Sequence, residues 1–277
     1  MSILVTGANG YIGRFVVRKL LEKGQDVLAA DLSFSEVDDR ATRIKADIFS
    51  GDSDIYEECG KPDVLIHLAW RNGFMHNHMS HITDLPKHYE FLKNMVDGGL
   101  KHLVVMGSMH EVGYFEGAIT EDVPCNPSSL YGISKNALRQ MMLLLSQNND
   151  IIYQWIRGYY IFGDDARNQS IFSKIIQAVK DGKTEFPFTS GKNKYDFLNV
   201  EDLAEQICAV ALQKEVTGII NCCSGVPVSL GEKVESFIKD NGYSITLKYG
   251  AFPDRVYDSP AVWGDNTKIK AIMEHQS

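Results

Sequence analysis

The fold of this chain is decided by the stretch Thr6-Gly7-Ala8-Asn9-Gly10-Tyr11-Ile12-Gly13, whose glycines are spaced as G-x-x-G-x-x-G. In such a loop one glycine makes a tight turn, one lets the backbone approach a phosphate, and one lets a helix pack closely on a strand. The stretch follows an apolar run, Ser2–Thr6, and opens a segment with helical spacing, Tyr11–Lys23. Free N–H groups and the positive dipole at the helix N-terminus suit a pyrophosphate. We therefore predict a dinucleotide-binding turn, with a purely structural turn as the alternative, whose binding residues are Gly7, Asn9, Gly10, Tyr11, Ile12 and Gly13.

Acidic residues follow the next two predicted strands. Asp31 ends the strand Val27–Ala30 and lies 18 residues after Gly13, about where an acid hydrogen-bonds the ribose 2′-hydroxyl. A carboxylate there repels the 2′-phosphate of NADP, so the cofactor is NAD or NADP with NAD favoured. Asp47 and Ile48 close the strand 43–47 and are candidates to flank the adenine; an ordinary surface position is the alternative for each acid.

Strands and helices alternate through the first part of the chain. This order predicts an α/β fold with a Rossmann-like doubly wound parallel sheet. The segments are the strands Val64–Leu68, Leu103–Met106 and Ile151–Ile156, and the helices Lys87–Gly98 and Ser129–Asn148. The stretch Asn72–Pro86 carries no clear pattern.

The alternation loosens after about Gly163. Helical spacing recurs at Ile171–Asp181, Asp202–Gln213 and Gly231–Asn241, with a polar loop at Ser190–Lys194 and an apolar run at Gly218–Cys222. We expect a smaller C-terminal substrate lobe over the carboxyl edge of the sheet, where such folds bind ligands. The cofactor domain would comprise residues 1–163 and about 195–225, and the lobe about 164–194 and 226–277.

A phenol and an ammonium are four residues apart at Tyr131 and Lys135, so they share one face of the predicted helix. A positive charge beside a phenol lowers its pKa, and tyrosine with its usual pKa near 10 is otherwise a poor catalyst at neutral pH. Lys135 can also bond the nicotinamide ribose. Ser108 follows the strand Leu103–Met106, at an edge that faces the ligand crevice. We predict that these three residues are catalytic; the alternatives are a surface pair and a serine that caps a turn.

These motifs together resemble those of the extended short-chain dehydrogenases/reductases, the NAD-dependent epimerase/dehydratase group that acts on nucleotide-diphosphate sugars. The resemblance covers nearly the whole chain. Ser108 stands five residues before Gly113, as in the family's Ser/Thr–Tyr–Lys set, and His67-Leu68-Ala69 is similar to its strand-four motif beside the cofactor. Further similarity lies in the segments Arg157–Gly163, Tyr195–Ala204 and Arg255–Lys268.

The resemblance also implies contacts to the substrate, a nucleotide-diphosphate sugar. Arg255 is similar to the family arginine that grips the diphosphate, and a guanidinium suits that role because it forks onto phosphate oxygens. The other expected substrate contacts are Trp70, His110, Glu111 and Arg157, while Leu68 and Ala69 are expected beside the cofactor.

The departures from the family narrow the reaction. Sugar dehydratases carry an acid pair directly after the catalytic hydroxyl, but here Met109 and His110 follow Ser108. The segments Gly107–Gly113 and Leu130–Arg139 are most similar to reductases of dTDP-4-keto-6-deoxyhexoses. We therefore expect a nucleotide-sugar 4-ketoreductase of surface-polysaccharide sugar synthesis. A 4-epimerase with tightly bound NAD, or a non-catalytic cofactor-binding regulator, are the alternatives.

Composition limits the partners. The net charge of −8 disfavours nucleic acid, and no apolar run approaches the roughly 20 residues that span a bilayer. Five dispersed cysteines without metal spacing, and a start without a signal-peptide pattern, fit a reducing cytoplasm. The spacing of His76, His78 and His81 matches no common zinc site, so we expect no metal and place them in a loop near the substrate mouth. The family resemblance suggests a homodimer.

Overall fold

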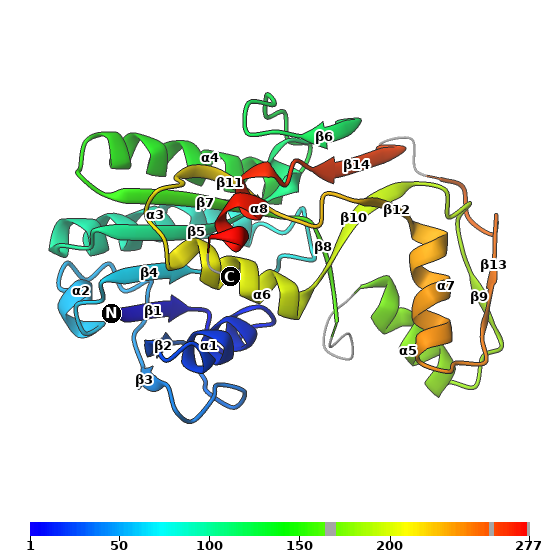
Figure 1. Ribbon diagram of the computed structural model, residues 1–277, viewed down its shortest axis with the longest axis horizontal. Coiled ribbons are helices and arrows are strands. Elements are labelled where there is room, and N and C mark those ends of the chain that lie inside the picture. Colours follow the sequence, from blue (N-terminus) through cyan, green and yellow to red (C-terminus); the bar gives the residue numbers. More distant parts are fainter. Residues whose placement is uncertain (164–169, 255–257, 276–277) are drawn as a thin grey trace.

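The computed structural model describes residues 1–163, 170–254 and 258–275. Its larger part is built on a seven-stranded sheet in which all neighbouring strands are parallel (Figure 1). The spatial order is β11 (Gly218–Cys222), β7 (Ile152–Gly158), β5 (His102–Ser108), β4 (Val64–His67), β1 (Ser2–Thr6), β2 (Asp26–Ala30) and β3 (Thr42–Ile44). The chain runs outward from β1 to β3 and then returns to β4 on the other side of β1. The strand order therefore reverses between β1 and β4, which is where ligands bind in such sheets.

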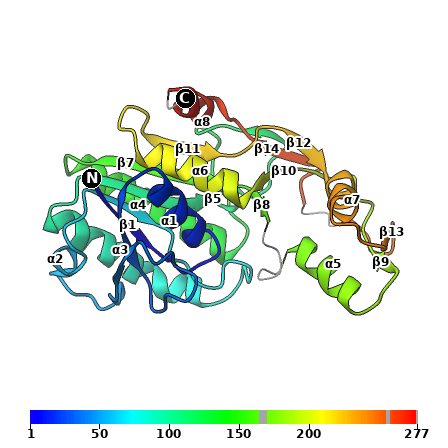
Figure 2. The same ribbon diagram turned by 60° about the horizontal axis from the view of Figure 1, so that its bottom comes forward.

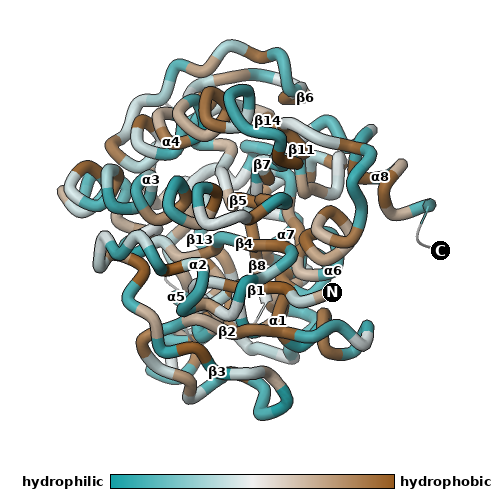
Figure 3. The backbone as a smooth tube through the Cα atoms, turned by 90° about the vertical axis from the view of Figure 1, so that its left-hand side faces the viewer, coloured by the Kyte–Doolittle hydropathy of each residue, from teal (hydrophilic) through white to brown (hydrophobic). Residues whose placement is uncertain are grey.

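Helices cover both faces of this sheet. Alternate residues of β1 point to opposite faces, so Ile3 and Val5 join one apolar core and Leu4 joins the other. One core is closed by α1 (Gly13–Glu22), α6 (Val200–Ala211) and α8 (Thr267–Glu274), and the other by α2 (Ile55–Glu58), α3 (Ser80–Gly98) and α4 (Leu130–Gln147). Figure 3 shows the hydrophobic strands in the middle of these layers. A strand buried on both faces needs such a continuous apolar run.

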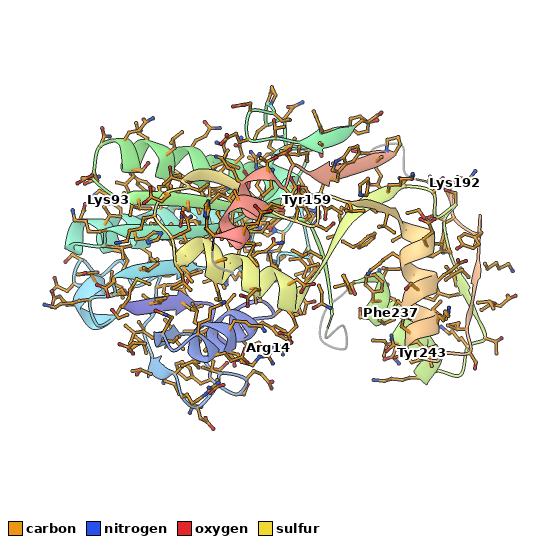
Figure 4. The ribbon with its side chains drawn as sticks, in the orientation of Figure 1. Arg14, Lys93, Tyr159, Lys192, Phe237 and Tyr243 are labelled. Carbon is orange, nitrogen blue, oxygen red and sulfur yellow. The ribbon has the colours of Figure 1, made fainter. Side chains whose placement is uncertain are left out.

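An outer lobe stands beside the large sheet, as the turned view in Figure 2 also shows. Its inner part is a sheet of β12 (Pro227–Ser229), β10 (Lys194–Asn199), β14 (Ala261–Gly264) and β6 (Gly117–Ile119), with β8 (Tyr160–Phe162) paired to β10. Its outer part packs α5 (Ile171–Lys180) and α7 (Leu230–Asp240) with the strand pair β9 (Glu185–Pro187) and β13 (Thr246–Lys248). Figure 4 labels Phe237 and Tyr243 beside α7; their ring centroids are 6.0 Å apart.

The predicted fold class is confirmed, but three local expectations differ. The helix expected from Lys87 begins at Ser80, so α3 includes Pro86, and it occupies half of the stretch left unassigned. Strand β3 ends at Ile44, before the expected Asp47. The C-terminal α8 packs on α6 and β11 rather than in the outer lobe. The proposed division of the chain into two domains stays a prediction.

Within the described residues, no helix is long and apolar enough to cross a membrane.

Candidate active site

The glycine turn after β1 is shaped for close backbone approach. Gly7 has φ +69°, and a Cβ there would stand 2.8 Å from the backbone nitrogen of Ala69. A Cβ on Gly13 would stand 2.0 Å from the carbonyl oxygen of Gly7. Among the described residues, no side chain caps the start of α1. The N–H groups at this end of the helix therefore lack a side-chain acceptor. The Gly10 N–H closes the turn by donating to the carbonyl oxygen of Gly7 at 3.0 Å. This cradle fits a pyrophosphate, which the backbone N–H groups at the start of α1 would hold.

Asp31 faces the same turn. Its Oδ2 accepts a hydrogen bond from the backbone N–H of Asn9 at 2.9 Å, and the Asn9 amide donates to Ser33 at 2.8 Å. The Tyr11 hydroxyl donates to the carbonyl oxygen of Gly163, which ties the turn to the end of β8. The carboxylate thus stands at the carboxyl end of β2 beside the turn, where a ribose would be held.

The remaining cofactor candidates have different surroundings. Ala69 lies against Gly7, and Leu68 donates its N–H to the carbonyl oxygen of Thr6 at 3.2 Å, so both line the turn. Asp47 is exposed and accepts from the N–H of Phe49 at 2.9 Å, while Ile48 packs against the core under α3. Their contact with an adenine stays a prediction.

Ser108 and Tyr131 meet at the carboxyl end of β5. The Ser108 hydroxyl is close enough to the Tyr131 phenol to lower its pKa, although 23 residues separate the two. Ser108 ends β5, and its hydroxyl accepts from the N–H of His110 at 3.3 Å, so its own proton is free to point at the phenol. Tyr131 lies in the first turn of α4, which Ser129 caps through the N–H of Gly132 at 3.2 Å. The structure therefore brings together the two hydroxyls that the sequence pairs.

Lys135 is buried one turn further along α4. Its Nζ donates to the carbonyl oxygen of Met106 at 2.7 Å and lies 3.8 Å from the centroid of the Trp70 ring. Burial lowers the pKa of Lys135 to about 7, which the carboxylate of Glu111 partly opposes.

The expectation that Lys135 lowers the pKa of Tyr131 is not met. Burial raises that pKa to about 12; the hydrogen bond from Ser108 lowers it and the Glu111 carboxylate raises it. Lys135 Nζ is directed at the carbonyl oxygen of Met106 and the face of Trp70, and the lysine is not among the groups that shift this pKa. In this arrangement the phenol is a proton donor at neutral pH.

Rings of histidine and tryptophan surround Tyr131. His76 stacks on the phenol at 5.4 Å, and His110 and His81 meet it edge-on at 6.0 and 5.3 Å. Burial lowers the pKa of His110 to about 4, so this imidazole is neutral at physiological pH. Trp70 donates its indole N–H to His81 at 3.0 Å. His110 and Trp70 thus border the Tyr131 phenol, and their contact with the substrate stays a prediction.

Glu111 and Arg157 lie elsewhere than the sequence suggested. Both side chains are wholly buried, and Arg157 Nε stands 3.4 Å from Glu111 Oε2. Arg157 also donates to the carbonyl oxygen of Thr120 at 3.2 Å. The expected substrate contacts of these two residues are therefore wrong, because both point into the protein beneath Ser108. Arg255 lies outside the described residues.

Sequence reasoning gave no role to Arg139 or His88 in this region, and it did not foresee the contacts of His67. Arg139 approaches Glu111 at 3.4 Å; it follows Tyr131 by eight residues on the same helix face, which was a usable signal. His67 bonds Thr6 at 2.8 Å and His88 at 2.9 Å, both inside the core. Nothing in the local sequence pairs residues 67 and 88, since α3 brings them together only in the fold.

A parallel sheet with a glycine turn after β1, and a serine, tyrosine and lysine at the end of β5 and the start of α4, define a nucleotide-dependent oxidoreductase. The model of the NAD dependent epimerase/dehydratase family matches residues 3–223. The chain belongs to this family, which confirms the resemblance drawn from its motifs.

Similar proteins agree with this membership. The dTDP-6-deoxy-L-talose 4-dehydrogenase (NAD(+)) of Aggregatibacter actinomycetemcomitans is 46% identical over 271 residues, which cover 95% of this chain and 99% of that protein. The UDP-glucose 4-epimerase of Lactobacillus helveticus is 26% identical, over 99% and 91% of the two chains. With the family, the dehydrogenase relative supports an NAD-dependent oxidoreductase that acts on sugars.

Solved structures show the same fold. The UDP-glucose 4-epimerase of Thermotoga maritima with UDP-glucose has a TM-score of 0.81 at 21% identity, over 98% of this chain and 92% of that one. The UDP-glucuronic acid 4-epimerase of Bacillus cereus with UDP-glucuronic acid and NAD has a TM-score of 0.80 at 22% identity, over 99% and 93%.

Proposed function

We propose that this protein is an NAD-dependent 4-dehydrogenase of a dTDP-6-deoxyhexose, which interconverts the C4 alcohol and the 4-keto sugar. The observation that carries the proposal is the approach of the Ser108 hydroxyl to the Tyr131 phenol at the carboxyl end of β5, close enough to lower the pKa of the phenol. The relative that is 46% identical over 95% of the chain supports dTDP-6-deoxy-L-talose as the sugar. NAD is favoured over NADP because Asp31 would repel a 2′-phosphate beside the turn.

In this proposal each residue of the site has one task. When bound, NAD accepts the hydride of C4, and NADH returns it in the reverse direction. Tyr131 takes the proton of the C4 hydroxyl during oxidation and gives it back to the C4 oxygen during reduction. Ser108 donates a hydrogen bond to the same oxygen, whose partial negative charge grows as the carbonyl is reduced. Lys135 stands one turn beyond Tyr131, where it can bond the nicotinamide ribose.

The test is a substrate panel with the purified full chain. We expect dTDP-6-deoxy-L-talose and NAD⁺ to give NADH and the 4-keto sugar in equal amounts, with the new carbonyl seen by NMR. UDP-glucose is the control with the wrong nucleotide and a 6-hydroxyl. If no dTDP-6-deoxyhexose reduces NAD⁺ and no 4-keto form oxidises NADH, the proposal is wrong.

A 4-epimerase is the second candidate, because the same catalytic set serves it and the UDP-glucose 4-epimerase of L. helveticus spans nearly the whole chain. An epimerase would retain NAD through purification and interconvert C4 epimers with no net NADH. The amount of cofactor released on denaturation, measured with the sugar products, separates the two candidates.

The proposed dimeric state and cytoplasmic location remain predictions, as does a place in surface-polysaccharide sugar synthesis.

A further inference from the structure

A carboxylate lies directly beneath the catalytic serine. Glu111 Oε1 accepts two short hydrogen bonds, from the backbone N–H of Ser108 and from the indole N–H of Trp155, both at 2.7 Å. Its Oε2 stands 3.4 Å from the guanidinium Nε of Arg157 and of Arg139. Ser108 and Glu111 also form a capping box around η1 (Met109–Glu111). The serine is therefore bonded to this carboxylate through its own backbone.

The backbone before Ser108 is adapted to this contact. A Cβ on Gly107 would stand 2.4 Å from Glu111 Oε1 and 2.2 Å from Trp155 Nε1. Any other residue at 107 would push the carboxylate and the indole away from β5. The fit of glycine, carboxylate and indole fixes where the strand ends and where the serine side chain leaves it.

A charge at this depth is expensive for the fold. None of the Glu111 side chain is exposed, and removing a carboxylate from water costs several kcal/mol unless ion pairs and hydrogen bonds compensate. A capping box around η1 does not require a buried carboxylate. Ser229 and Glu232 make the same capping box at the start of α7 while exposed to solvent. The buried version has additional donors from β7, namely Trp155 and Arg157, and an ion-pair contact with Arg139 of α4. These groups converge on the residue that holds Ser108.

We propose that Glu111 is a positioning residue for Ser108, and that its carboxylate, clamped by Trp155, Arg157 and Arg139, fixes the serine hydroxyl beside Tyr131. The inference rests on the proposed function, in which Ser108 bonds the C4 oxygen. Glu111 acts through the backbone of Ser108 and contacts neither substrate nor cofactor.

The same carboxylate acts on the proton donor. Burial is the larger cause of the raised pKa of Tyr131, and the Glu111 charge adds to it. The other titratable groups about the phenol are Lys135 on its own helix, His110 of η1, His76 of the loop after β4 and His81 of α3. Removal of the Glu111 charge should therefore lower the pKa of Tyr131 and move the oxidation pH profile to lower pH.

The test replaces the carboxylate by an amide of the same shape, Glu111→Gln. We expect kcat for reduction to fall about tenfold, the scale of one lost orienting hydrogen bond, with NADH affinity unchanged. The oxidation pH profile should move to lower pH. In the NMR spectrum of the free protein, the Ser108 amide proton should move upfield, because its bond to a charged acceptor is lost. The matched control is Glu232→Gln, which makes the same change in the exposed capping box and should leave kcat and the pH profile as in wild type.

The inference is overturned if Glu111→Gln keeps the wild-type kcat and pH profile, or if its kcat loss equals its loss of folded protein in a thermal melt. Should that variant fail to fold, Arg139→Gln removes one clamp from a partly exposed position of α4. A wild-type kcat and an unmoved Ser108 amide in Arg139→Gln would then overturn it. Failure of the proposed function is distinguishable, because the wild-type protein would turn over no dTDP-6-deoxyhexose while the amide shift still reports on the clamp.

Discussion

The large sheet and the outer lobe bury different chemistry. At the carboxyl end of β5 the large part buries Lys135, Glu111 and Arg157, and it shifts the pKa of the lysine to about 7 through burial. The outer lobe closes α5 and α7 around an apolar cluster that includes Phe172, Ile175 and Val234. Burying a charged group costs free energy unless an ion pair or hydrogen bonds compensate for its lost water. We therefore expect buried charges where their pairing has a function. In the proposed function the reaction takes place at this edge of the sheet. The lobe also buries a carboxylate, Asp196 of β10, which instead accepts hydrogen bonds from backbone N–H groups of Ser224, Gly225 and Gly264.

Replacement of the phenol tests the contrast most strongly. In Tyr131→Phe the proton donor is lost but the ring contacts remain, so we expect kcat to fall about 10²-fold or more, with little change in stability. Steady-state rates and a thermal melt measure both. The control is Tyr249→Phe in the outer lobe, where the lost hydroxyl bonds only Glu235 among the interactions described, at 2.6 Å. An equal kcat loss in both variants would remove the distinction between the two regions.

The pH dependence of the wild type tests the same edge. Oxidation needs the deprotonated phenol of Tyr131, and burial raises its pKa to about 12. Below a pKa the deprotonated fraction rises about tenfold per pH unit, so kcat for oxidation should rise with pH between about 7 and 9. Reduction uses the protonated phenol, which is in excess throughout, and should not rise. A plateau in the oxidation rate already below about pH 8 would show that the phenol is not held in its protonated form.

The smallest effect on turnover is expected inside the outer lobe. Ile175 is fully buried among apolar neighbours. Ile175→Val should lower the free energy of unfolding by about 0.5–1.5 kcal/mol and leave kcat unchanged. Denaturant unfolding and steady-state rates check this. A kcat loss without a stability loss would mean that the lobe core takes part in the reaction after all.

The large sheet was predictable because its signals are local. A buried parallel strand is a continuous apolar run, and the turn after β1 has glycines at fixed spacing, so both appear within a few residues. The outer lobe gave weaker signals. Strands such as β9 and β13 have three residues each and pair with each other across about 60 residues. The stretch Asn72–Pro86 carried no clear pattern, yet α3 begins at Ser80 and includes Pro86, with Asp84 and His88 on either side of it buried.

The site was predictable as far as single motifs reach. Ser108, Tyr131 and Lys135 belong to short patterns, and the fold brings the two hydroxyls together. The partners of Glu111 lie far along the chain, 28 residues away at Arg139 and 46 away at Arg157. Because the sequence does not show that these residues meet, Glu111 looks from sequence alone like an acidic residue of an exposed loop. The same limit applies to the histidines around Tyr131, which reach the phenol from three separate segments.

One strand, β4, stands between β1 with its glycine turn and β5 with its serine. Neighbouring strands are about 4.8 Å apart, so the turn and the serine are separated by roughly 10 Å across the end of β4. Backbone hydrogen bonds between the strands fix this distance, so replacing a side chain cannot lengthen it. In the proposed function this spacing sets how far the pyrophosphate of the cofactor lies from Ser108, and sequence changes in the outer lobe would leave it unchanged.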